Sequence, residues 1–197
     1  VEAPETSVEV AKTAFPDGAD WAIVASSIGF ADAMSATGLA GTLDCPILIT
    51  DSKKTTPAVL EEIERLGAKD VYLVGGTVAL SKQVENDIVA TGVNVGRIWG
   101  PDAWDTSVAC NTKIVEHGGN PESHAIIATS KNFQDALSIS SFAFKYKVPI
   151  FLTTSKNALP TAARTAITGM TGSVFVAGGG VVVPSTIAES AFGTTRT

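Results

Sequence analysis

Short apolar runs alternate with longer amphipathic segments along the whole chain. In the first half the apolar runs are five or six residues long, are rich in β-branched side chains, and are closed by turn-forming or polar residues. Runs of this length and composition predict buried strands of a parallel sheet. The predicted strands cover residues 22–27, 46–50, 71–75 and 95–99.

Segment 57–66 has the clearest period of an amphipathic helix among the intervening segments. Its apolar residues recur at i, i+1, i+4 and i+7, which places them on one face. Pro57 suits the first turn of a helix, and Gly67 is a common residue at a helix C-terminus. We expect this helix to bury Val59, Leu60, Ile63 and Leu66 and to expose Glu61, Glu62 and Glu64.

The same alternation continues to the end of the chain. We expect further helices over 31–43, 81–91, 106–117, 133–147, 159–169 and 184–192, and further strands near 125–130, 148–153 and 174–178. The helix over 31–43 is rich in small residues, which permit a close approach to the sheet. These small residues are Ala31, Ala33, Ala36, Gly38, Ala40 and Gly41.

An internal repeat divides the chain into two units. At an offset of 103 positions, residues 22–84 are identical to residues 125–187 at 19 of 63 places, which chance similarity explains poorly. Residues 6–8 match 106–108 at an offset of 100, so the units differ in length within the turn near residue 121. We therefore predict two tandem three-layer α/β/α modules, 1–105 and 106–197, each with a mainly parallel sheet and right-handed crossovers.

Composition and charge exclude several classes of protein. The 197 residues are 45% hydrophobic and 17% charged, with 14 basic and 20 acidic residues, which argues against a disordered chain or a basic nucleic-acid-binding arm. No apolar stretch approaches the roughly 18 to 20 residues that a membrane-spanning helix needs, so we expect no membrane insertion. Cys45 and Cys110 are too few for a disulfide scaffold, and we expect two buried, unpaired thiols.

The net charge of −6 is divided unevenly between the two units. Residues 1–105 carry 16 acidic and 7 basic residues, whereas residues 106–197 carry 4 acidic and 7 basic residues. The second unit is therefore the better candidate to bind an anion. Alternatively, the two units or neighbouring subunits complement each other in charge.

The candidate ligand-binding residues lie where the predicted strands end. Ligands of an open parallel sheet collect at the carboxyl ends of its strands, and these loops offer hydroxyls, amides, backbone N–H groups and a few lysines. Such groups suit a sugar or a phosphate, whereas the chain shows no nucleophile beside a histidine, no metal-ligand cluster and no nucleotide fingerprint. We therefore expect no catalysis, cofactor or metal. The candidates in the first unit are Ser27, Asp32, Thr50, Ser52, Lys53, Gly75, Gly76, Thr77 and Arg97, and those in the second are Ser130, Lys131, Asp135, Thr153, Ser155, Lys156, Gly178 and Gly179.

A purely structural role is the alternative for each of these residues. Ser, Thr, Asp and Asn at strand ends commonly cap helices and close turns. Asp32 and Asp135 occupy equivalent positions in the first turn of a predicted helix, where a carboxylate fixes a loop or complements the helix dipole. The glycine pairs that begin at Gly75 and Gly178 are explained by tight turns with positive φ.

The motifs taken together resemble the cell-wall-binding repeat type 2 family, whose modules occur in tandem in surface proteins of Gram-positive bacteria, including clostridial S-layer-associated proteins. The resemblance covers nearly the whole chain twice, and the order and spacing of the motifs carry it. In the first unit the motifs are Phe-Ala-Asp-Ala-Met (30–34), Pro-Ile-Leu-Ile-Thr (46–50), Leu-Gly-Ala-Lys-Asp-Val-Tyr-Leu-Val-Gly-Gly (66–76) and Arg-Ile-Trp-Gly (97–100). In the second unit they recur as Phe-Gln-Asp-Ala-Leu (133–137), Pro-Ile-Phe-Leu-Thr (149–153) and Val-Phe-Val-Ala-Gly-Gly (174–179).

The resemblance implies an extracellular, non-catalytic anchor on the cell wall. Members of the family bind an anionic wall polysaccharide or a teichoic-acid-like polymer non-covalently, usually through three modules in a row. The Pro-Ile-Leu stretch is the most recognisable functional motif of the family, and residues 46–49 and 149–152 match it. The usual Asp-Arg-Tyr at the module junction is replaced by Asp102-Ala103-Trp104, so a role of that arginine is absent here. The visible modules number two, so we expect a third module or self-association as a partner.

Two other functions fit the same residues. One is an α/β enzyme or binding protein for a sugar or a sugar phosphate, with a cleft between the units. The other is a self-assembly module whose apolar faces pair subunits. A deep pocket with paired carboxylates would favour the former, and association without any ligand would favour the latter.

Overall fold

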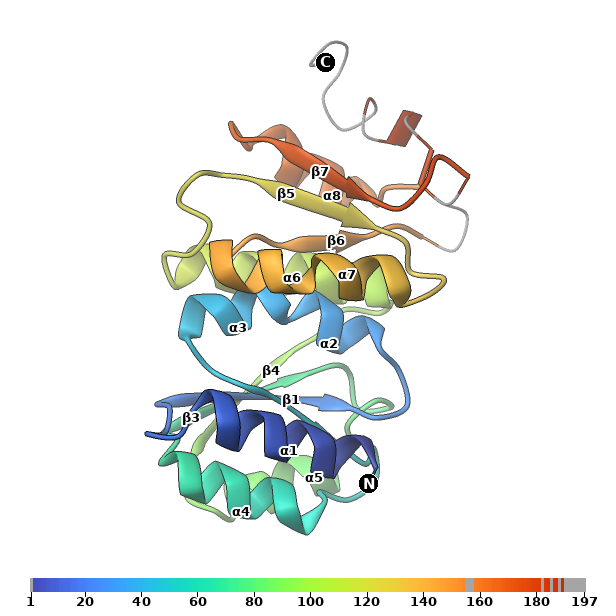
Figure 1. The fold of residues 1–197 in the computed structure, drawn as a ribbon. Helices are drawn as coiled ribbons and strands as arrows, with labels where there is room; N and C mark the ends of the chain where they lie inside the picture. The colour runs from blue at the N-terminus through green and yellow to red at the C-terminus, as the bar shows by residue number, and fades with distance from the viewer. Residues whose placement is uncertain (1, 155–157, 182, 185, 188, 190–197) are drawn as a thin grey trace.

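The computed structural model describes residues 2–154, 158–181, 183, 184, 186, 187 and 189, and these residues form two α/β modules stacked on each other (Figure 1). In the first module four parallel strands lie in the order β2-β1-β3-β4. In the second module three parallel strands lie in the order β6-β5-β7. The strands are β1 (Trp21–Ser26), β2 (Ile47–Thr50), β3 (Asp70–Val74), β4 (Asn94–Ile98), β5 (Ala125–Ala128), β6 (Ile150–Leu152) and β7 (Val174–Ala177).

Helices cover both faces of the first sheet, because neighbouring strand residues point to opposite faces. Ala22 and Val24 of β1 pack on one side with α1 (Ala3–Ala14), α4 (Pro57–Leu66) and α5 (Lys82–Val89). Ile23, between them, packs on the other side with α3 (Thr37–Leu43), which follows α2 (Ala31–Ser35). The first module is therefore a three-layer sandwich.

The second module repeats this arrangement with α6 (Ala103–Glu116), α7 (Gln134–Tyr146) and α8 (Thr161–Thr168). Ile127 of β5 packs with α8, and Ile126 packs with α7 on the opposite face. The predicted α/β class, parallel sheets and two modules are confirmed. The predicted helix over 31–43 is two short helices, and the predicted helix over 184–192 falls partly outside the described residues.

The modules contact each other through helices in the middle of the molecule, where α2 and α3 lie against α6 and α7 (Figure 1). Gly38 and Gly41 of α3 approach the backbone of the second module so closely that a Cβ at either position would collide with the carbonyl of Val148 or Phe144. At these two glycines the close neighbour is therefore the second module, and our expectation that they approach their own sheet was wrong.

Helices α1 and α6 occupy equivalent places in the two modules. The Ser7 hydroxyl accepts a hydrogen bond from the Ile49 N–H at 2.9 Å, and the Ser107 hydroxyl accepts one from the Leu152 N–H at 3.2 Å. Each serine thereby ties its helix to the edge strand of its own sheet. The predicted division between residues 105 and 106 falls within the first turn of α6.

Two details of the sequence-based picture concern buried polar groups. Glu62, which we expected to face water, is 1% exposed and pairs with the Arg65 guanidinium at 2.8 Å. A buried carboxylate needs such a partner, and Arg65 is available because residues three apart are neighbours on a helix. The burial of Glu62 is what the sequence did not reveal. Cys45 and Cys110 are buried and unpaired as predicted.

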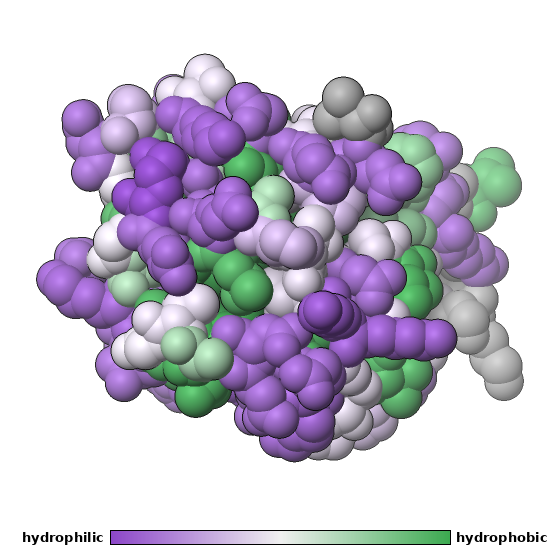
Figure 2. Space-filling model, turned by 90° about the horizontal axis from the view of Figure 1, so that it is seen from below, coloured by the Kyte–Doolittle hydropathy of each residue, from purple (hydrophilic) through white to green (hydrophobic). Residues whose placement is uncertain are grey.

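The outer face of the first module, built from α1, α4 and α5, is mainly hydrophilic when seen from below (Figure 2). The exposed residues Glu61 and Glu64 of α4 contribute to this face. Within the described residues, no helix is long and apolar enough to cross a membrane.

Candidate functional site

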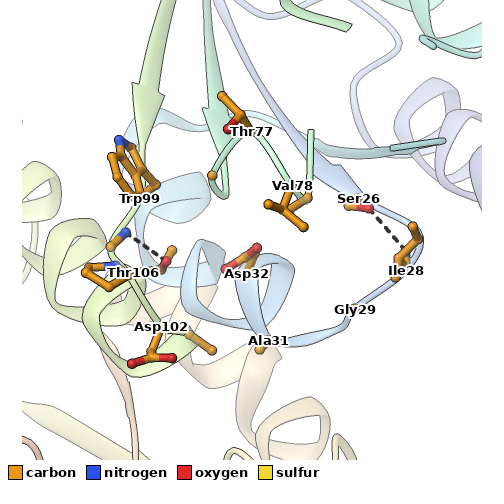
Figure 3. Close-up of a pocket in the computed structure, with 15 residues that line it drawn as sticks. Ser26, Ile28, Gly29, Ala31, Asp32, Thr77, Val78, Trp99, Asp102 and Thr106 are labelled. Atoms are coloured by element: carbon orange, nitrogen blue, oxygen red, sulfur yellow. Dashed lines mark hydrogen bonds between the residues drawn. The ribbon is translucent and has the colours of Figure 1, made fainter. Parts of the chain in front are cut away.

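A pocket of about 380 Å³ opens at the carboxyl end of the first sheet, beside the junction between the modules. The ends of β1, β3 and β4 meet the beginnings of α2 and α6 there, as the order of a parallel sheet requires. Figure 3 shows the Asp32 carboxylate in the middle of the labelled side chains, with Val78 on one side and Asp102 and Thr106 on the other.

Asp32 joins the two modules at this pocket. It lies in the first turn of α2, and its carboxylate lies close to the hydroxyl of Thr106 in α6. Burial raises the pKa of Asp32, and the neighbouring Thr106 hydroxyl opposes the rise. The Thr106 Oγ1 also accepts a hydrogen bond from the Gly100 N–H at 3.1 Å, which fixes the junction loop.

The two aspartates of the repeat also lie against the loops after the third strands. A Cβ built at Gly75 would lie 2.6 Å from Oδ2 of Asp32, and one at Gly178 would lie 2.8 Å from Oδ2 of Asp135. Both glycines have positive φ, 122° and 127°, so the predicted tight turns are confirmed. A side chain at either glycine would displace the aspartate.

The loop after the first strand has the same geometry in both modules but carries different chemistry. The Ile28 N–H donates to Oγ of Ser26 at 3.2 Å, and the Lys131 N–H donates to Oγ1 of Thr129 at 3.1 Å. Both side chains at the equivalent position are exposed. The repeat thus places an isoleucine at the first sheet and a lysine at the second.

Polar atoms without partners gather at the carboxyl end of the second sheet. Oγ1 of Thr153 and Oδ1 of Asn132 are buried, and neither has a hydrogen-bond partner in the described part of the chain. The equivalent Thr50 of the first module is satisfied, because its Oγ1 accepts from the Thr56 N–H at 2.8 Å. Since buried polar groups are usually paired, these two oxygens are unusual, and Thr50 shows that the first sheet satisfies the equivalent threonine.

Arg97 is held within the protein rather than directed at solvent. Its guanidinium lies 2.8 Å from the Glu85 carboxylate and donates to the Gly75 carbonyl oxygen at 2.8 Å. Its side chain is 13% exposed. Arg97 therefore supports the loop after β3.

The other predicted residues of the first module divide between the pocket and a separate loop. Gly76 and Thr77 line the pocket with Asp32, and Ser27 lies exposed at the end of β1. Ser52 and Lys53 close the loop after β2 against α5, through backbone carbonyls that accept from Ser81 at 2.8 and 2.9 Å.

In the second module, Ser130, Asp135, Thr153, Gly178 and Gly179 lie at the carboxyl end of the sheet, beside Lys131. Ser155 and Lys156 lie outside the described residues. The structure therefore brings the predicted residues to two strand-end regions, one in each module. Their role in binding a ligand stays a prediction.

Sequence reasoning missed the apolar part of the pocket. Ile28, Val78 and Trp99 line it and are 74%, 95% and 55% exposed. The sequence signal was present, because each of these large apolar residues lies at or within three residues of a predicted strand end, where polar residues are the norm. Asp102 adds a second carboxylate to the lining.

Among the described residues, no group of three or more His, Cys, Asp or Glu side chains could hold a metal ion. Burial raises the pKa of both thiols, Cys45 and Cys110, well above the ordinary value, so neither is poised as a nucleophile. The described lining of the pocket brings together two carboxylates, Asp32 and Asp102, with hydroxyls and apolar side chains.

Comparison with known proteins identifies the two modules. The family described as cell wall binding domain 2 (CWB2) matches residues 3–85 and 97–188. N-acetylmuramoyl-L-alanine amidase LytC of Bacillus subtilis (strain 168) is 30% identical over 179 residues, which are 90% of this chain and 35% of that protein. The amidase enhancer of the same organism is 33% identical over 131 residues, 66% of this chain and 18% of that protein.

Solved structures show the same fold. Cwp6 from Clostridium difficile superposes with a TM-score of 0.88 at 28% identity, covering 96% of this chain and 30% of Cwp6. Cwp8 from the same organism gives a TM-score of 0.86 at 25% identity, covering 96% of this chain and 32% of Cwp8. The chain thus spans about a third of these proteins and of LytC. With the family matched over both modules, the chain belongs to the cell wall binding domain 2 family and is a tandem pair of its wall-binding modules.

Proposed function

We propose that this chain holds a surface protein on the outside of a Gram-positive cell by binding an anionic wall polymer, without catalysing a reaction. The match of both modules to the wall-binding family carries the proposal. The amidase LytC and the amidase enhancer both contain a similar segment as a minor part of their length, which suits an anchor joined to different effectors. Repeated weak contacts along a polymer gain affinity through multivalency.

The second module is the better site for the anionic groups of the polymer. Its residues carry an excess of basic over acidic side chains, whereas the first module is strongly acidic. Lys131 is exposed at the end of β5, near the unpartnered oxygens of Thr153 and Asn132. A polymer with phosphate and hydroxyl groups would pair with the ammonium and satisfy these oxygens.

Cosedimentation with purified wall sacculi tests this role. The chain is expected to sediment with intact sacculi and to remain in solution when the anionic polymer has been extracted. Equal sedimentation with both preparations would contradict the choice of an anionic polymer.

A single charge change tests the proposed location. Lys131→Gln is expected to weaken binding to intact sacculi by about fivefold, the loss of one partly exposed charge-assisted contact. Lys69→Gln is the matched control, because Lys69 is exposed and lies on the first module beside Asp20. Equal losses in both variants would indicate a nonspecific charge effect.

The proposal includes a further repeat, in the parent protein or in a second copy, that packs against α1 and α7. Val10 of α1 is 61% exposed, whereas the equivalent Cys110 of α6 is fully buried against the first module. A groove of about 580 Å³ between α1 and α7 is lined by the apolar residues Val10, Met34 and Leu137. A helix equivalent to α6 or α7 would fill it and complete a trimeric arrangement of modules.

Labelling at Val10 tests this contact. A Val10→Cys variant is labelled with a maleimide in two preparations, the isolated chain at high concentration and the intact parent protein. Labelling is expected to be slow in the preparation in which a further repeat covers α1. Val89→Cys on α5 is the control, because Val89 is 51% exposed and lies away from the groove. Rapid labelling of both variants in both preparations would overturn the proposed contact.

A further inference from the structure

The pocket beside Asp32 differs in chemistry from its counterpart in the second module, although the two regions share one fold. The loop after the first strand carries Ile28 in the first module and Lys131 in the second. Both loops contain the same local hydrogen bond, between residues two apart in the sequence. In the first module the exposed rim is therefore apolar, and in the second it is cationic.

The rim of this pocket combines one aromatic and two aliphatic side chains. Trp99 follows β4, and a Cβ built at Gly76 would lie 3.5 Å from its ring, so the indole covers that glycine. More than half of the Trp99 surface, 55%, remains exposed together with Val78 and Ile28. A large aromatic surface held at a pocket rim is suited to contact with a flat, partly apolar ligand.

The charged groups of the pocket are carboxylates, and Ser26, Thr77 and Thr106 add hydroxyls. Asp32 lies at its centre and Asp102 at its edge (Figure 3), and none of the described residues that line it is a lysine or an arginine. A carboxylate has about four acceptor positions, and no hydrogen bond from a described residue to the Asp32 side chain is seen in Figure 3. The pocket thus accepts hydrogen bonds from hydroxyls and repels anions.

We propose that this pocket binds an uncharged pyranose residue of a wall glycan, with Trp99 stacking on the C–H face of the ring and Asp32 accepting hydrogen bonds from its hydroxyls. A pyranose has these two surfaces, whereas a phosphate or an acidic sugar would meet two carboxylates. The pocket volume of about 380 Å³ is within the range of small-ligand sites. The inference rests on the proposed wall-binding function and adds a neutral subsite to it.

The direct test is saturation-transfer NMR of the chain with neutral methyl glycosides of glucose, galactose and N-acetylglucosamine, and with N-acetylglucosamine 6-phosphate as the anionic probe. The measurement uses the Lys131→Gln chain, so that the proposed anion site of the second module does not contribute to the signal. We expect a signal from at least one neutral glycoside, with affinity in the millimolar range that a few such contacts give, and a much weaker signal from the phosphate. In this variant, a phosphate that binds as well as the neutral sugars, or a neutral panel without any signal, would overturn the inference.

Variants locate the site. Trp99→Ala and Val78→Asp are each expected to reduce the glycoside signal at least fivefold. The side chain of Val78 is 95% exposed, so Val78→Asp removes no packed group. Val181→Asp is the matched control, because Val181 is the repeat equivalent of Val78, is 92% exposed and should leave the signal unchanged. The proposal would also be overturned if the glycoside signal survives in both pocket variants. The same holds if a short apolar peptide binds the pocket more tightly than the sugar and displaces it.

The sacculus assay separates this inference from the function on which it rests. A chain that sediments with sacculi but gives no glycoside signal loses the neutral subsite and keeps the anchoring role. A chain that binds glycosides but sediments equally with extracted sacculi keeps the subsite and loses the anionic polymer.

Discussion

Helices α1 and α6 are equivalent in the repeat, yet α1 lies on the outside of the molecule and α6 lies between the two modules. Both are tied to their own sheet by the same serine hydrogen bond. Cys110 and Ile114 of α6 are nevertheless buried in the core of the first module, while Val10 of α1 is largely exposed. Within the described residues, the same element can therefore be a surface helix or a core helix, depending on whether another module packs against it.

The largest expected effect comes from emptying the buried face of α6. Ile114→Ala should lower the free energy of unfolding by about 3 kcal/mol, because a fully buried Ile leaves a cavity. Val10→Ala on α1 should change it by less than about 0.5 kcal/mol, because the side chain is exposed. Urea denaturation of both variants checks the contrast, and similar losses would show that α1 is also covered in solution.

A second comparison concerns the close approach of α3 to α7. Gly41→Ala places a Cβ against the Phe144 backbone and should lower the free energy of unfolding by about 2 kcal/mol, the cost of overpacking. Ser141→Ala is the control, because Ser141 is exposed on α7 at the repeat equivalent of Gly38. Thermal unfolding followed by circular dichroism measures both, and a neutral Gly41→Ala would mean that the modules separate easily.

A smaller and pH-dependent effect is expected at the end of the first sheet, where β4 has no described counterpart in the second module. Hydrogen bonds from Arg97 and then Lys82 lower the pKa of Glu85 below its ordinary value. The ionised carboxylate therefore stabilises the fold above that ordinary pKa, and the contribution disappears as the pH falls through the lowered pKa.

Glu85→Gln should accordingly cost about 1 kcal/mol at pH 7, a modest value for a partly exposed pair, and almost nothing at strongly acidic pH. Glu9→Gln, which removes an exposed ion pair with Lys12, should cost less at pH 7. Urea denaturation across this pH range checks the prediction. A cost for Glu85→Gln that does not change with pH would contradict the assigned pairing.

The smallest effect is expected for the thiols that lie between the modules. Cys45 and Cys110 are buried, and burial raises the pKa of both, so a thiol reagent should not modify the native chain appreciably at pH 8. Both thiols should react fully in urea. Ile114→Ala should speed the native reaction by loosening the shared core, and rapid labelling of the unmodified chain would show that the modules part readily.

Local pattern was enough to predict most of the fold. The helix over 57–66 begins and ends where Pro57 and Gly67 predict, and every described strand lies within about two residues of its predicted range. The alternation of strand and helix then predicts a parallel sheet, because a helix that crosses over between two strands of one sheet brings them parallel. The internal repeat supplied the number of modules.

What the sequence could not predict is which partner each apolar face contacts. Cys110 and Ile114 follow the period of a buried helix face, but periodicity does not say that the core belongs to the other module. Glu62 looked like a surface residue because the sequence does not show that its face of α4 is covered, although its partner Arg65 is only three residues away in the same helix. The candidate site showed the same limit, because Trp99 meets Asp32 and Val78 only when three strand ends converge.

The contact between Asp32 and Thr106 pairs two different surfaces, one from each module. The repeat equivalents of these two residues, Asp135 and Thr6, lie on opposite modules. If a further repeat used the same contact, it would add head to tail, and the rotation between successive modules would decide whether the series closes into a ring or extends as a filament.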